Sequence, residues 1–315
     1  QLTYLIAEAP STTIGNDVDM GLQFPADLTS LEFLQGLIEK FNLVIEPITG
    51  ERNTLIIEPY ENWLDGGEIK DWTDKVDRNI NFSIKHPITE QPKTIRFSDV
   101  DDDDTLNVYH KNRTGRTFGE YTYSTDSDLA SGERTIGKVF SPTPTKGIDG
   151  GNHFIIPQLC KRDDVGDVLP FKFKPRLLQR IGLKDVFTNE AKGIDGASAS
   201  AGTYYIRDIF GGVNAHTQYF AVGSLSDVDA DFSADNTLLF NATQHYPYHQ
   251  KFANGYVIND AFRQYWARYL NSELYDIDSR KLTLNVVLKP NEYFNFQLND
   301  NIFIDGAYYR INKLS

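Results

Sequence analysis

The 315-residue chain has 40% hydrophobic and 24% charged residues, which is the composition of a folded protein and excludes an intrinsically disordered one. A formal net charge of −13 disfavours contact with a phosphate backbone, so we expect no nucleic-acid partner. No apolar run approaches the roughly 18 residues of a membrane span. Cys160 is the one cysteine, which excludes an intramolecular disulfide and a cysteine-based zinc site.

The first segment, QLTYLIAEAP, has neither an initiator Met nor the pattern of a signal peptide. We therefore expect a fragment or a processed product whose first domain is incomplete. Further on, Thr29 and Glu32 have the spacing of a capping box, and apolar residues then recur at helical spacing over 30–41. Two β-type runs at 42–48 and 54–60 follow, joined by a short, turn-rich connector, and predict a hairpin.

The middle of the chain has the pattern of short strands and long loops. Short strands are predicted between residues 71 and 97, and an acidic turn at 99–104 precedes a short helix in TLNVYHKN. Gly, Thr, Ser and Pro dominate residues 113–152, and small residues dominate 191–202. Both stretches are typical of loops and edge strands rather than of a core.

The last third of the chain, like the first, has the pattern of a helix followed by strands. Asn259 or Asp260 is placed to cap an amphipathic helix that starts at Ala261. A strand at 281–288 ends before Pro290, and YFNFQL and NIFID are predicted as further strands. The dipeptide Asp305-Gly306 predicts a hairpin turn before AYYRINKL. A helix followed by three or four antiparallel strands would close into a small barrel or pack as a meander.

Together these elements predict an α+β, mainly β fold, with small antiparallel barrels or meanders and two amphipathic helices. We expect a helix-plus-hairpin domain at 1–77 and a β-rich middle domain with long loops at 78–190. A loop-rich insertion at 191–258 and a helix plus barrel-like strands at 259–315 complete the plan.

Motifs for catalysis are missing from the sequence. It has no nucleophile elbow, phosphate-binding loop, dinucleotide fingerprint or HExxH, so we expect no catalytic residue, no cofactor and no enzyme activity. His245 and His249 have the spacing of metal ligands on a helix, but Pro247 between them favours an aromatic surface loop. A buried, inert thiol is the expectation for Cys160.

The acidic run contains the candidates for a metal site: Asp101, Asp102, Asp103 and Asp104. Their hard oxygen atoms suit calcium, but the run lacks the glycine and the distal glutamate of an EF-hand loop. The favoured interpretation is an acidic turn that caps the helix after it, because aspartate near a helix start complements the helix dipole. Whether an ion binds at 99–104 stays open.

Three segments carry a family resemblance. They are residues 31–63 with DWTDKVD after them, FKFKPRLL at 171–178, and the C-terminal runs 265–288 and 296–314. They resemble, in this order, tail proteins of bacteriophages that infect Bacteroidetes and marine bacteria, and more broadly the baseplate hub proteins of phage tails. The resemblance implies a hub-like fold of small β-barrels in a ring that joins the tail tube to the spike or fibres. It maps no catalytic or ligand-binding residue onto this chain.

The leading hypothesis is thus a non-enzymatic structural component of a phage tail, located in the virion and assembled in the host cytoplasm. Its partners would be other tail and baseplate proteins, and the chain itself would form a trimer or hexamer. One alternative is a tail-associated cell-wall or polysaccharide hydrolase, which needs two suitably placed carboxyl groups. Another is a receptor- or carbohydrate-binding module that uses the aromatic loop at Tyr246 and Tyr248.

Overall fold

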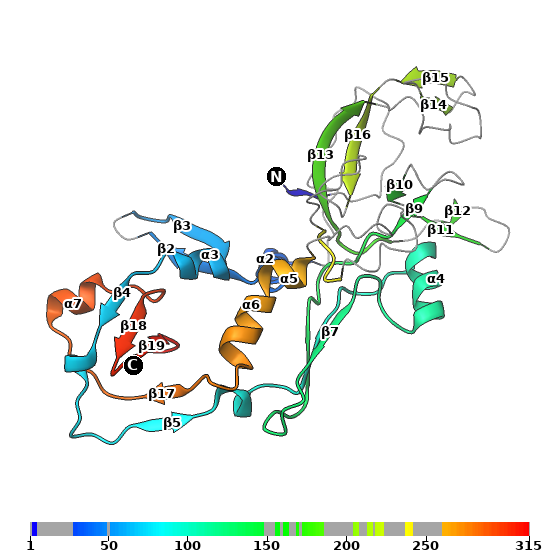
Figure 1. The fold of residues 1–315 in the computed structure, drawn as a ribbon. Coiled ribbons are helices and arrows are strands. Elements are labelled where there is room, and N and C mark those ends of the chain that lie inside the picture. The colour runs from blue at the N-terminus through cyan, green and yellow to red at the C-terminus, as the bar shows by residue number, and fades with distance from the viewer. Residues whose placement is uncertain are drawn as a thin grey trace. The chain divides into compact units, whose positions relative to one another are not determined.

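The chain forms two compact units in a computed structural model (Figure 1). The structure describes residues 2–4, 28–48, 51–147, 155–157, 160–163, 168–169, 172–185, 204–207, 213–216, 218–223, 237–241 and 260–314. The first unit comprises residues 1–36, 96–122 and 135–264, and the second comprises 37–95, 123–134 and 265–315. The four-domain plan expected from the sequence divides the chain into contiguous segments, whereas each unit combines three separate segments, and the plan stays a prediction.

Helix α2 (Ser30–Phe41) begins at the predicted capping box. The Thr29 amide donates to Glu32 Oε2 at 2.9 Å and the Glu32 amide donates to Thr29 Oγ1 at 3.2 Å. Strands β2 (Leu43–Pro47) and β3 (Leu55–Pro59) follow as an antiparallel pair. The helix and the hairpin are therefore confirmed, and a short helix that the sequence did not predict, α3 (Tyr60–Asp65), comes directly after them.

A mixed sheet holds the core of the second unit. Its order is β19 (Ala307–Arg310), β18 (Asn301–Ile304) and β4 (Ile69–Asp71). Strands β18 and β19 are antiparallel, and Asp305 and Gly306 between them have positive φ angles of 49° and 89°, which confirms the predicted turn. Strand β4, however, pairs in parallel with β18, where antiparallel pairing was expected. Trp72, Ile302 and Ile304 form the buried cluster of this sheet.

The segment before β18 differs from the sequence-based expectation. YFNFQL was expected as a strand, but Pro290–Asn295 is helix α7. The reason is local: Pro290 occupies the first helical turn, where no N–H is needed, and Glu292 Oε2 accepts from the Lys289 amide at 2.8 Å as a helix-start cap. Further back, β17 (Lys281–Thr283) pairs with β5 (Ser83–Lys85) as a two-stranded ribbon.

The predicted C-terminal helix is present in interrupted form. It consists of α5 (Ala261–Tyr265), α6 (Ala267–Tyr269) and a π-helical turn, Leu270–Leu274. Asp260 Oδ1 accepts from the Arg263 amide at 2.7 Å, so Asp260 is the residue that caps it. Phe262, Trp266 and Leu270 are buried, as the amphipathic pattern predicts.

Helix α4 (Thr105–Thr114) and several small sheets build the first unit. Phe97 lies in an aromatic core, with ring centroids 5.5 Å from Phe240 and 5.1 Å from Phe262. Strand β13 (Leu177–Asp185) pairs with β1 (Leu2–Tyr4) on one side and with β16 (Gln218–Gly223) on the other. The remaining pairs are β9 (Thr145–Gly147) with β10 (Ile155–Pro157), β11 (Lys161–Arg162) with β12 (Val168–Leu169), and β14 (Tyr204–Arg207) with β15 (Val213–His216).

One further sheet has the order β7 (Tyr121–Ser124), β6 (Thr94–Phe97) and β8 (Glu133–Ile136). Two single 3₁₀ turns, Thr73–Lys75 and Pro87–Glu90, complete the described elements. The chain is thus a mixed α and β protein with small antiparallel and mixed sheets. The expected closed barrels do not occur among the sheets that the structure describes. Within the same residues, each helix is too short or too polar to cross a bilayer.

Candidate functional site

The acidic run leads into α4, as the sequence predicts. Asp104 is the N-cap of this helix: its backbone is extended, with φ −66° and ψ 150°, and its Oδ1 accepts from the Asn107 amide at 3.1 Å. Gly115, with a φ of 72°, ends the helix in the left-handed conformation that favours glycine. The capping interpretation of the acidic turn is confirmed.

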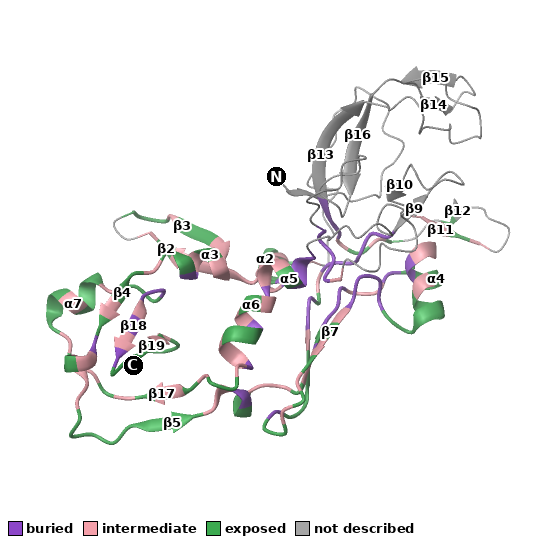
Figure 2. Ribbon diagram, viewed as in Figure 1, coloured by how far each residue is buried: buried purple, intermediate pink, exposed green. Residues whose placement is uncertain are grey.

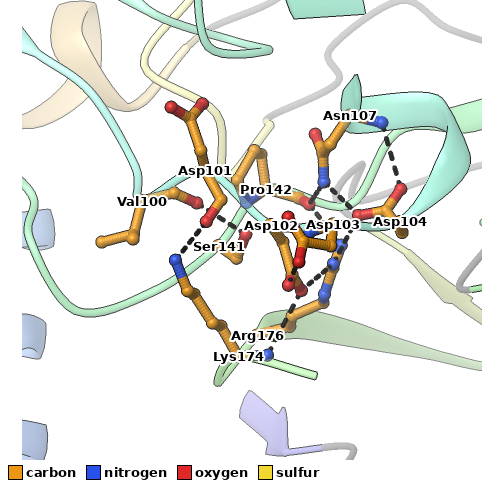
Figure 3. A network of polar contacts seen from close by, with 10 residues as sticks. All are labelled: Val100, Asp101, Asp102, Asp103, Asp104, Asn107, Ser141, Pro142, Lys174 and Arg176. Atoms are coloured by element: carbon orange, nitrogen blue, oxygen red, sulfur yellow. Dashed lines mark hydrogen bonds and ion pairs between the residues drawn. The ribbon is translucent and has the colours of Figure 1, made fainter. Parts of the chain in front are cut away.

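A buried arginine lies at the centre of the same region (Figure 3). Arg176 Nη2 is 2.5 Å from Asp102 Oδ2 and 2.7 Å from Asp104 Oδ2. The side chains of Arg176, Asp102 and Asp104 are only 1%, 3% and 0% exposed. Ions at this depth are stable only when they are paired and hydrogen-bonded, so the three side chains depend on one another.

Backbone and amide groups supply the remaining hydrogen bonds of this network. Asp102 Oδ1 accepts from the Asp103 amide at 2.9 Å, and Asp102 Oδ2 also accepts from the Lys174 amide at 3.2 Å. The Asn107 side chain donates both to Asp104 Oδ2 and to the Pro142 carbonyl. Arg176 Nη1 donates to the same carbonyl. Three stretches of chain, 102–107, 142 and 174–176, are held together in this way.

The charges of the network do not cancel. Two aspartates face one guanidinium, which leaves one formal negative charge in a buried place. The start of α4 and the donating backbone amides offset part of it, since a helix N-terminus carries a partial positive charge. Arg176 Nε, Asn107 Oδ1 and Thr143 Oγ1 are buried and have no hydrogen-bond partner among the residues that the structure describes. The arrangement is that of a cross-link between chain segments, with its ionic groups already engaged.

Asp101 and Asp103 point elsewhere. Asp101 pairs with Lys111 and accepts from Thr117 Oγ1 at 2.7 Å. Partial burial raises the pKa of Asp101, but the hydrogen bonds from Lys111 and Thr117 outweigh it and hold that pKa below its usual value. Asp103 is exposed. The four candidate aspartates therefore do not converge on one point, and the described part of the chain contains no group of three His, Cys, Asp or Glu side chains arranged to hold a metal ion.

The remaining sequence candidates are two histidines, two tyrosines and Cys160. His245, His249, Tyr246 and Tyr248 lie outside the described residues. Cys160 is half-buried, and its carbonyl accepts from the Thr105 amide at 3.0 Å at the start of α4.

A second polar cluster, which the sequence did not indicate, lies in the second unit. Tyr60 donates its hydroxyl hydrogen to Glu273 Oε2 at 2.6 Å, and Arg310 Nη1 is 2.7 Å from Glu273 Oε1. Burial, followed by the hydrogen bond to Glu273, raises the pKa of Tyr60 well above its ordinary value. Tyr60 is thus a neutral hydrogen-bond donor at physiological pH. No local sequence signal joins residues so far apart in the chain.

Comparison with protein-family models, with curated proteins and with solved structures finds no match to this chain.

Proposed function

We propose that this protein is a non-enzymatic structural component of a bacteriophage tail, a baseplate or hub subunit that joins the tail tube to the spike or fibres. One observation carries the proposal: the segments that resemble phage tail proteins supply buried scaffold residues. Trp72 comes from DWTDKVD, Arg176 from FKFKPRLL, and Ile302 from the C-terminal run. All three side chains are buried. Packing and internal pairing thus account for the sequence pattern that these segments share with phage tail proteins.

The surface of the second unit adds support. Large apolar side chains lie exposed on its small sheets and on α7, and β5 and much of α7 are among the exposed elements in Figure 2. Ile84 on β5 and Phe294 on α7 are examples, and Phe294 is 80% exposed. Phe82 and Val287, in loops of the same unit, are exposed as well. Exposed large apolar groups are common at protein–protein contact surfaces. An assembly subunit needs such surfaces.

Purified virions of the phage that encodes this chain test the proposal. Mass spectrometry should find the chain in the virions, and a gold-labelled antibody raised against it should mark the tail end that carries the spike or fibres. A non-structural protein of the same phage is the control for contamination. Absence of the chain from washed virions, or labelling on the capsid, would contradict the proposal.

A hydrolase assay tests the non-enzymatic part. Purified chain incubated with host peptidoglycan and capsule should release no soluble fragments above the level of a buffer control. Release of fragments that one Asp or Glu substitution abolishes would overturn this part and favour the hydrolase alternative.

A further inference from the structure

His110, in the second half of α4, carries a buried polar atom that no hydrogen bond satisfies. Its Nε2 is buried and has no hydrogen-bond partner among the described residues. Its ring meets the ring of Phe118 edge to face, with the ring centroids 5.2 Å apart and the ring planes at 87°. Phe118 itself is only 2% exposed. The imidazole is therefore packed as an apolar side chain would be.

The end of α4 brings these two rings together. Gly115, with its φ of 72°, ends the helix and lets the chain leave the helix axis. Thr114 Oγ1 then donates to the His110 carbonyl at 2.9 Å and accepts from the Arg116 amide at 3.2 Å. These bonds tie the segment that carries Phe118 to the last turn of the helix. Loss of the contact between the rings would accordingly loosen the end of α4.

The neutral imidazole suits this position, whereas the imidazolium does not. A neutral histidine has one bare ring nitrogen, but both ring nitrogens of the charged form are donors. A donor on buried Nε2 without an acceptor, together with an unpaired charge, is far more unfavourable than a bare nitrogen there. Burial accordingly lowers the pKa of His110, and the positive charge of Arg113 lowers it further. Proton binding and the packed position thus oppose one another.

The charged groups around this contact supply no counter-ion for an imidazolium. Arg113 on α4 and Arg116 just after it are themselves cations. The carboxylates on the adjoining segments are already engaged, since Asp101 pairs with Lys111 and Glu120 lies 3.8 Å from an arginine on β6. Because the described residues offer Nε2 no acceptor, a protonated Nε2 has to reach water.

We propose that His110 is an acid-sensitive latch: protonation of its Nε2 separates the ring from Phe118 and opens the end of α4 over residues 108–119. The sign follows from the lowered pKa of His110. The stability that the closed latch contributes is complete above the unfolded value of about 6.5 and is lost as the pH falls through the lower folded value. The Arg176 network holds the other end of α4, so the opening is local. The latch does not depend on the proposed tail function.

Hydrogen exchange of peptides that cover residues 105–120, measured at pH 7.5 and at pH 5, tests the latch. Each rate is compared with that of the same peptide in the unfolded chain, which removes the intrinsic effect of pH on exchange. The protection of the wild type should fall at pH 5 by up to roughly 30-fold, the limit set by an unfolded pKa of about 6.5. His110→Phe and His110→Gln have no titrating group there and should be protected equally at both pH values. His86→Gln, in the second unit, is the control and should keep the wild-type response.

Comparison of the two pH values within one variant keeps the test decisive, because a substitution that merely loosens α4 changes both rates alike. The ion pair of Asp101 with Lys111 does not interfere, since the pKa of Asp101 lies below its usual value and its carboxylate stays charged at pH 5. Unchanged wild-type protection at pH 5 overturns the proposal. So does slower exchange in acid, which attraction between an imidazolium and the ring face of Phe118 would produce. A pH response that persists in either His110 variant, or that disappears in His86→Gln, also overturns it.

Discussion

Replacing Arg176 by methionine tests how strongly the buried network holds the first unit together. The substitution keeps much of the side-chain volume but removes the cation from between Asp102 and Asp104, which are almost fully buried. It also removes the donor to the Pro142 carbonyl. Removing one partner of a buried ion pair costs about 3–5 kcal/mol, because the opposite charges stay behind without compensation. We expect a loss of that size.

The measurement has to report on the first unit. All three tryptophans, Trp63, Trp72 and Trp266, belong to the second unit, so fluorescence would miss the change. Hydrogen exchange followed by mass spectrometry on peptides from α4 is local to it. A loss of 3–5 kcal/mol corresponds to exchange that is roughly 100- to 5,000-fold faster where global or sub-global opening controls it.

Lys174→Met is the matched control. Lys174 lies two residues away and carries the same charge, but it is exposed, and its side chain donates to the Asp101 carbonyl. We expect at most about 1 kcal/mol from its loss. Adding Asp102→Asn and Asp104→Asn to Arg176→Met should recover part of the stability, since asparagine also caps helices and carries no charge. Equal exchange rates in the Arg176 and Lys174 variants would refute the role assigned to the buried pair.

Three further predictions concern other parts of the chain. Gly67→Ala should destabilise the second unit by about 3 kcal/mol or more, since a Cβ there would lie 1.9 Å from the Asn299 carbonyl oxygen. Urea unfolding followed by tryptophan fluorescence measures this loss. Gly66→Ala is the tolerated control, because its Cβ would approach other atoms no closer than 3.4 Å. Burial raises the pKa of Tyr275 to about 12, so the stability that its neutral form contributes is complete below the unfolded value of about 10 and is lost as the pH rises towards 12. Absorbance titration at alkaline pH should show several late-ionising tyrosines, Tyr60 and Tyr275 among them, and one fewer in Tyr275→Phe. An unchanged number of late-ionising tyrosines in this variant would contradict the burial argument. Calcium and a chelator should both leave Tm unchanged, because Asp102 and Asp104 already bind Arg176; a rise with calcium would restore the metal-site hypothesis for residues 99–104.

The elements predicted correctly from the sequence are those with a complete local signal. The start of α2 needs only Thr29 and Glu32, and the β18–β19 turn needs only Asp305 and Gly306. Helix α7 was not predicted, because the alternating aromatic residues of YFNFQL have the pattern of a strand, although Pro290 and Glu292 form a local helix-start signal. Local cues were present there, and they outweighed the apparent strand pattern.

The features that were missed for a physical reason involve distant parts of the chain. The parallel pairing of β4 with β18 joins strands more than two hundred residues apart, and nothing near either strand specifies its direction. Arg176 stands in FKFKPRLL beside two lysines, and only its burial makes it the counter-ion of the acidic run. The sequence predicted that the acidic turn caps a helix. It did not show that Arg176 is the cation that pairs with Asp102 and Asp104.

The buried ionic network implies an order of folding and assembly. The described partners of Arg176 belong to the same chain and the same unit, so this network can close before any subunit contact forms. Folding of the first unit should therefore precede assembly. Dilution that dissociates the subunits should accordingly leave the hydrogen exchange of α4 unchanged, whereas Arg176→Met should raise it at every concentration. Exchange in α4 that speeds up on dilution would show instead that folding and assembly are one coupled step.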